Sequence, residues 1–141
     1  MYTNPSSDFE QDTGSPSSFE FSPLLDDGFL RNHYGEDISD AAFAFDLFLT
    51  VTMQTYREFE SVVTNAGCTD SLRTLAHRLC PSFRLVGLTD LADRLRDIQH
   101  DSANYACLFK AAERITEEFA EMLPVVEKQR EEIFKNINGL S

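Results

Sequence analysis

The sequence contains no tryptophan and few residues that interrupt helices, with 6 glycines and 5 prolines among 141 residues. So few turn-forming residues favour long helices over many short strands. No apolar run approaches the length of a membrane span. The 3 cysteines are odd in number and form no CxxC pair. Together with a polar, acidic beginning that is unlike a signal peptide, this predicts a cytoplasmic protein with reduced thiols.

Positive charge is also scarce. The sequence has 12 lysines and arginines but 24 acidic residues, which gives a net charge of −12. An acidic protein repels phosphate backbones, so we expect neither nucleic acid nor an anionic membrane as a partner. The simplest role of this charge is solubility. Any site that handles phosphate must therefore be a local basic patch that acts against the overall charge.

The apolar content is high enough for a folded core, with 42% hydrophobic residues and 12 phenylalanines. Residues 1–23 are rich in serine, proline and acids and lack periodicity, which predicts a flexible tail or linker. Residues 24–141 form the expected folded unit. Within it, apolar residues recur at helical spacing in one short and four longer segments. The expected helices lie within 24–36, 39–66, 69–86 and 88–99 and from about 103 onward.

Four amphipathic helices joined by short turns predict an all-α fold, an antiparallel up-down four-helix bundle with a short N-terminal helix. Ser39 is the expected N-cap of the first long helix, and Gly67 its left-handed C-cap. Pro124 is expected to kink the last helix. The charged segment from Glu127 onward is expected to project beyond the core.

His77 is the residue that best fits a chemical role. It lies about 150° from the centre of the apolar stripe of its helix, so we expect it to face solvent. Arg73 and Arg84 fall on the same face. A neutral imidazole nitrogen is a nucleophile, and guanidinium forks match phosphate oxygens. The spacing alone fits an ordinary solvated helix face as well.

The segment Leu75-Ala-His-Arg-Leu-Cys-Pro-Ser-Phe-Arg-Leu-Val-Gly87 resembles the active helix of histidine-containing phosphotransfer (HPt) domains. The family pattern is roughly A-H-x-L-K-G-S-x-x-x-x-G, followed by a helix of the type L-x-x-L-x-x-x-L. The matching positions are His77, Leu79, Ser82 and Gly87, continued by Leu88, Leu91, Ala92 and Leu95. The resemblance covers about residues 28–130, in helix order as well as motif.

Two positions depart from the family pattern. Cys80 stands where the family often has lysine, and Pro81 where it often has glycine. Arg84 or Arg73 could neutralise phosphate in place of that lysine. The variant resembles the HPt modules of Bacteroidetes-type hybrid sensor kinases, which often carry a proline after the histidine. We expect Pro81, which cannot donate to the carbonyl of His77, to let a partner approach closely through a local kink and its small ring.

The resemblance implies that His77 is a phosphoryl acceptor in a phosphorelay. A response-regulator receiver domain, free or within a hybrid sensor kinase, would donate the group from an aspartate, and another receiver would take it. Mg²⁺ would come from the receiver, so this monomeric chain would bind no cofactor or metal and would be a carrier, not an enzyme. The residues expected to contact phosphate or partner are Arg73, Arg78, Pro81, Ser82 and Arg84, and Gly87 is expected to be needed for its backbone.

Other interpretations remain open at this point. The chain could be a protein-interaction module of the same fold in which His77 is incidental, or a helical fragment that only dimerises. Cys80 fits a small apolar filler at the core's edge, or a redox-sensitive position beside His77. His33 and His100 have no second ligand at metal spacing, which argues against zinc.

Overall fold

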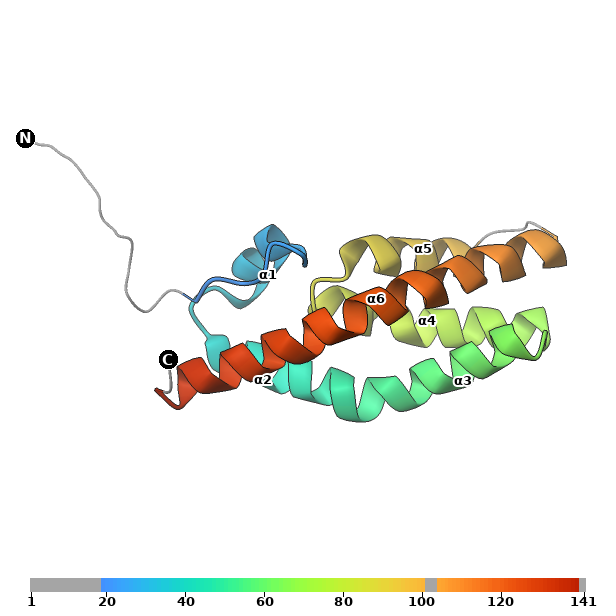
Figure 1. Ribbon diagram of the computed structural model, residues 1–141. Helices are drawn as coiled ribbons and strands as arrows, with labels where there is room; N and C mark the ends of the chain where they lie inside the picture. The colour runs from blue at the N-terminus through green and yellow to red at the C-terminus, as the bar shows by residue number, and fades with distance from the viewer. Residues whose placement is uncertain (1–18, 101–103, 140–141) are drawn as a thin grey trace, which may run out of the picture.

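The computed structural model describes residues 19–100 and 104–139, and within them the chain is all-α without strands. The helices pack as a bundle in which α6 runs along the length of the molecule (Figure 1). Their bounds are α1 Asp27–Tyr34, α2 Ile38–Leu47, the π-helical η1 Phe48–Thr52, α3 Met53–Thr64, α4 Thr69–Leu85, α5 Thr89–His100 and α6 Tyr105–Ile137. Residues 1–18 of the tail predicted over 1–23 lie outside the described residues, as do residues 101–103.

The first long helix has no loop within it, but its middle is π-helical instead of α-helical. It comprises α2, the π-helical turn η1 and α3, which follow one another without an intervening loop. Its N-cap is Asp37 and not Ser39 as predicted, because the Asp37 carboxylate accepts the N–H of Asp40 at 3.3 Å. A π-helical turn adds a residue to the winding, so regular α-helical spacing did not predict it.

The turn between α3 and α4 corrects the predicted cap at Gly67. Ala66, not Gly67, has the left-handed conformation, with a φ of 49°. The N–H of Gly67 then donates to the carbonyl of Val62 at 2.9 Å, which closes the end of α3. A side chain at Gly67 would meet Val62 Cγ1 at 3.1 Å. Glycine is therefore favoured here by the close approach of Val62.

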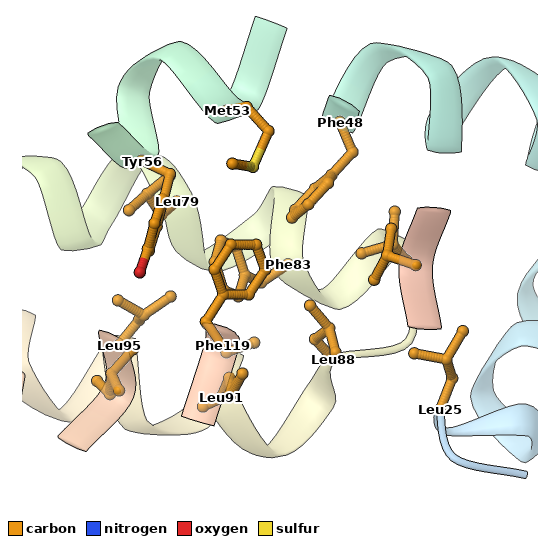
Figure 2. Packing of buried hydrophobic residues seen from close by; sticks show 14 of the residues in the cluster. Leu25, Phe48, Met53, Tyr56, Leu79, Phe83, Leu88, Leu91, Leu95 and Phe119 are labelled. Atoms are coloured by element: carbon orange, nitrogen blue, oxygen red, sulfur yellow. The ribbon is translucent and has the colours of Figure 1, made fainter. Parts of the chain in front are cut away.

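Aromatic rings fill the centre of the bundle. Phe83 of α4 and Phe119 of α6 lie with ring centroids 5.0 Å apart, and Tyr56 of α3 packs on Phe119 at 4.4 Å (Figure 2). Phe48 of η1 lies edge-on to Phe83 at 5.3 Å. The predicted apolar stripe of α4 is confirmed as buried: Leu72, Leu75, Ala76, Leu79, Phe83 and Val86. Aromatic residues of η1, α3 and α6 thus hold α4 in place through its inner face.

The chain before α1 is part of the core, which corrects the predicted boundary between residues 23 and 24. Phe21 and Leu25 are buried, and the backbone N–H of Ser22 donates to Gln129 Oε1 of α6 at 2.6 Å. The lack of periodicity over residues 1–23 had predicted a tail or linker up to residue 23. The folded unit includes residues 19–23 because Phe21 packs near Tyr34, with ring centroids 6.3 Å apart.

Gly87 forms the corner between α4 and α5, and it needs glycine as predicted. Its φ is +82°, and a side chain there would meet Leu30 Cδ1 at 2.8 Å and Leu25 Cβ at 3.1 Å. Asp26 fastens the same corner, since its N–H donates to the carbonyl of Gly87 at 2.8 Å and its carboxylate accepts the Thr89 hydroxyl at 2.7 Å. We call Leu25, Asp26, Leu30, Gly87 and Thr89 the Gly87 corner.

The C-terminal part of α6 packs on the core instead of projecting beyond it as predicted. Ile133 is fully buried, and Gln129 is nearly so. Arg130 donates two hydrogen bonds to Asp46 Oδ1 of α2, from Nη2 at 2.7 Å and from Nε at 3.0 Å. Pro124 lies within α6, and Pro81 lies within α4, without ending either helix. No helix in the described ranges is long and apolar enough to cross a membrane.

Candidate functional site

His77 is exposed on the outer face of α4, directly opposite the buried stripe, as predicted. Among the described residues, no hydrogen bond, ion pair or ring contact engages its imidazole. The inner face of the same helical turn is anchored by Ala76 and Leu79, both fully buried. The site is therefore an accessible imidazole on a helix that its core contacts hold firmly.

The side of α4 that faces α3 carries polar residues at helical spacing. Arg78 lies on this side, together with Ser71 and Thr74. They border an open groove of about 380 Å³ between α3 and α4. The other lining residues are Glu58, Val62, Asp70 and Leu75. Arg78 follows His77 in sequence, but its side chain borders the groove toward α3 and lies on a different side of α4 from Arg73 and Arg84.

An apolar surface lies farther along this side of α4, toward α2 and η1. Phe43 is 70% exposed, Val51 53%, Leu47 43% and Leu85 37%. We call these four residues the apolar patch. Phe43, Leu47 and Leu85 line a small cavity of about 110 Å³ together with Ser82, which is partly buried. The predicted partner-contacting residue Ser82 therefore borders an apolar surface on the helix that carries His77.

The opposite side of α4 faces α5 and carries Arg84. Arg84 donates to Asp93 Oδ1 of α5 at 2.9 Å, and this hydrogen bond raises the pKa of the Arg84 guanidinium against the smaller effect of desolvation. Arg96 of α5 approaches the same Asp93 oxygen at 3.5 Å. The sequence argument predicted Arg84 as a phosphate ligand but missed its partner Asp93 and the second arginine.

The remaining predicted site residues take different places. Arg73 is partly buried one turn before His77, and Pro81 is exposed one turn after it. Gly87 belongs to the corner at the end of α4 and not to the exposed face. His77 and Pro81 are thus exposed on α4, Arg73 is partly buried, and Arg84 turns toward α5, whereas Arg78 and Ser82 lie toward α3 and η1.

Cys80 lies at the edge of the core, between α4 and α5. It is partly buried against the core cluster, and its thiol donates to the carbonyl of Ala92 at 3.3 Å. This contact supports the interpretation of Cys80 as a packing residue. His33 stacks on Phe29 with ring centroids 5.3 Å apart, and in the described ranges no three His, Cys, Asp or Glu residues gather into a possible metal site.

No family model, curated protein or solved structure matches this chain. The functional argument therefore depends on the motif and on the surroundings of His77.

Proposed function

We propose that this protein is an HPt-type phosphorelay intermediate with the antiparallel up-down four-helix arrangement of that family. His77 accepts a phosphoryl group from a receiver-domain aspartate and passes it to another receiver. The single observation that carries the proposal is an exposed imidazole in mid-helix, anchored from behind and bordered by arginines, within a segment that resembles the family motif.

The transfer step is a substitution at phosphorus. The Nε2 lone pair of His77 attacks in line and forms the N–P bond, while the bond between phosphorus and the aspartyl oxygen breaks. The aspartate leaves as a carboxylate, and the imidazole keeps its Nδ1 proton, so no further proton has to move. Such transfer depends mainly on positioning and on charge stabilisation. Mg²⁺ and its acidic ligands belong to the receiver in this proposal.

The surface next to His77 supports docking of a partner. The apolar patch leaves Phe43, Leu47, Val51 and Leu85 open to solvent, although isolated domains rarely expose large apolar side chains together without a role. Pro81 is exposed between His77 and Leu85 on α4 and presents no long side chain to obstruct an approaching receiver. We assign the apolar patch and Pro81 to receiver docking.

The same apolar patch also favours the alternative, a helical interaction module without phosphoryl transfer. Cys80 in place of the family's lysine fits this alternative, because its thiol is engaged with Ala92 and supplies no cation. The two functions share the docking surface and differ only in the chemistry at His77. An experiment that measures phosphoryl transfer therefore separates them, whereas an experiment that measures binding alone does not.

The test is transfer of labelled phosphate from a panel of phosphorylated receiver domains to the wild type and to His77→Gln. Circular dichroism checks that both proteins are folded, which we expect because a substitution at an exposed position changes stability by about 0.5 kcal/mol or less. Label on the wild type only supports the phosphorelay. Binding of a receiver without label on the folded wild type would contradict it and support the interaction module.

A further inference from the structure

Two arginines converge on one carboxylate oxygen beside the candidate site. Arg84 of α4 and Arg96 of α5 approach Asp93 Oδ1 at 2.9 and 3.5 Å. All three side chains keep solvent contact, with 33% of Arg84, 49% of Asp93 and 53% of Arg96 exposed. Two guanidiniums around one anionic oxygen form an arrangement that would also suit an oxygen of a phosphoryl group.

The register of α4 and α5 places this cluster near His77. The turn at Gly87 reverses the chain, and the thiol of Cys80 contacts the carbonyl of Ala92 at 3.3 Å, so these two residues lie at the same level. His77 lies about one helical turn before Cys80 on α4, and Arg96 lies about one turn after Ala92 on α5. Because the two helices are antiparallel, both steps lead in the same direction along the bundle, by about 5 to 6 Å. His77 and Arg96 therefore arise from the same level of the two adjacent helices.

The side chain of Arg84 extends back toward this level. Its backbone lies one turn beyond Cys80, but its guanidinium reaches Asp93, which follows Ala92 directly. Side chains on a helix lean toward the helix N-terminus, and on α4 this direction leads from Arg84 toward His77. Asp93 thus holds the two guanidiniums together between α4 and α5, close to the level of His77 along the helices.

We propose that Arg96 is a phosphate-contacting residue of the phosphorylated protein, and that Asp93 is a positioning residue that holds Arg96 and Arg84 until the phosphoryl group arrives. This inference rests on the proposed function. The phosphoryl oxygens on Nε2 then compete with Asp93 for the guanidiniums. Arg96 replaces, from the neighbouring helix, the cation that Cys80 does not supply on α4.

The test uses phosphoramidate, a small donor whose nitrogen leaves as ammonia when the imidazole Nε2 forms its bond to phosphorus. The full chain is phosphorylated as wild type, Arg96→Ala, Arg96→Lys and Asp93→Asn. Arg57→Ala is the matched control, because Arg57 is exposed on α3 and its loss changes the net charge equally. The ³¹P chemical shift and the half-life of the phosphohistidine are measured, with thermal unfolding as a check of the fold.

We expect Arg96→Ala to shift the ³¹P resonance and to shorten the phosphohistidine half-life about two- to fivefold, as loss of one exposed ionic contact allows. Arg96→Lys should restore most of the half-life. Asp93→Asn should slow phosphorylation, because the two guanidiniums are no longer held beside the site. If Arg96→Ala matches Arg57→Ala in both readouts while the wild type is labelled, the inference is overturned and the proposed function stands. A folded wild type without label overturns both.

Discussion

The outer face of α4 at His77 and the Gly87 corner belong to the same stretch of chain but have opposite surroundings. His77 is open to solvent and engages no described side chain, whereas Gly87 is so closely packed that an added methyl group would lie 2.8 Å from Leu30. Substitution of His77 should therefore abolish phosphoryl acceptance without changing the fold. Substitution of Gly87 should destabilise the fold without removing the group that accepts the phosphoryl.

This difference also shows how the exposed site is kept in place. The imidazole makes no hydrogen bond, ion pair or ring contact with the residues that the structure describes, so its position depends on the buried stripe of α4 and on the corner that ends the helix. Asp26 and Leu25, which precede α1, reach that corner from the N-terminal segment. The segment before α1 thus contributes to the position of the helix on which His77 lies.

The largest effect on stability is expected from Gly87→Ala. The left-handed conformation costs a non-glycine residue about 1 to 2 kcal/mol, and overpacking against Leu30 adds about 1 to 3 kcal/mol. Urea unfolding should therefore show a loss of about 3 kcal/mol. In a Leu30→Ala background the added cost of Gly87→Ala should be smaller. An equal cost in both backgrounds would show that the steric contact with Leu30 is not what requires glycine.

The role of the apolar patch can be tested with Phe43→Asp. If a receiver docks there, a buried aromatic anchor contributes more than about 1 kcal/mol, so affinity should fall about fivefold or more. Ile137→Asp is the matched control, because Ile137 is also an exposed apolar residue but lies at the end of α6. Calorimetric titration with a receiver measures both. Equal affinities of the two variants would remove the patch from the docking surface.

Asp26→Ala tests how much the hydrogen bonds of Asp26 at the Gly87 corner contribute to the stability of the fold. The hydrogen bonds from the Thr89 hydroxyl and the Phe29 N–H lower the pKa of Asp26 below 3.8. A carboxyl whose pKa is lowered by folding stabilises the fold above its unfolded-state pKa, and this stability is lost as pH falls through the folded-state pKa. The variant should be about 1 kcal/mol less stable at neutral pH, chiefly through loss of the N-cap.

The same argument predicts that the difference between Asp26→Ala and the wild type shrinks in acid, because protonation weakens the wild-type contacts. Unfolding in urea at neutral pH and below 3.8 measures it. Thr89→Val, which removes one of the two hydrogen bonds, should lie between the two proteins at neutral pH. A pH-independent difference would mean that the charge of Asp26 contributes nothing at this corner.

The smallest effect is expected from Arg84→Ala, which should slow phosphoryl transfer about two- to fivefold and leave the fold intact, since an exposed ion pair contributes little stability. Arg94→Ala is the matched control, because Arg94 pairs with Glu118 of α6 at 2.6 Å instead of with Asp93. Stopped-flow transfer from a receiver measures both rates. An unchanged rate for Arg84→Ala would show that Arg84 does not replace the family's lysine.

The sequence predicted the helices and the exposed position of His77 because helical periodicity separates the inner from the outer face of α4. It did not predict that Phe21 is buried, since the few phenylalanines of an acidic segment without helical or strand periodicity do not indicate a partner. The left-handed residue at 66 was also missed, because glycine at 67 fits the usual cap. Composition alone did not reveal that Gly67 is needed for space beside Val62.

The candidate site was predicted only in part for a similar reason. Arg73, Arg84 and His77 share one helix, so their spacing predicts a common face. Asp93 and Arg96 lie on α5, and their place beside Arg84 depends on the register of two antiparallel helices. The spacing of Asp93 and Arg96 by three residues was a usable signal for a pair on α5, but nothing in the sequence connected that pair to Arg84.

The most direct test of the central claim is to locate the phosphoryl group after transfer from a receiver. The chain has 3 histidines, and mass spectrometry with electron-transfer fragmentation distinguishes His77 from His33 and His100. We predict a single acid-labile, base-stable modification at His77, absent from folded His77→Gln. Modification of another residue, or equal labelling of His77→Gln, would contradict the account.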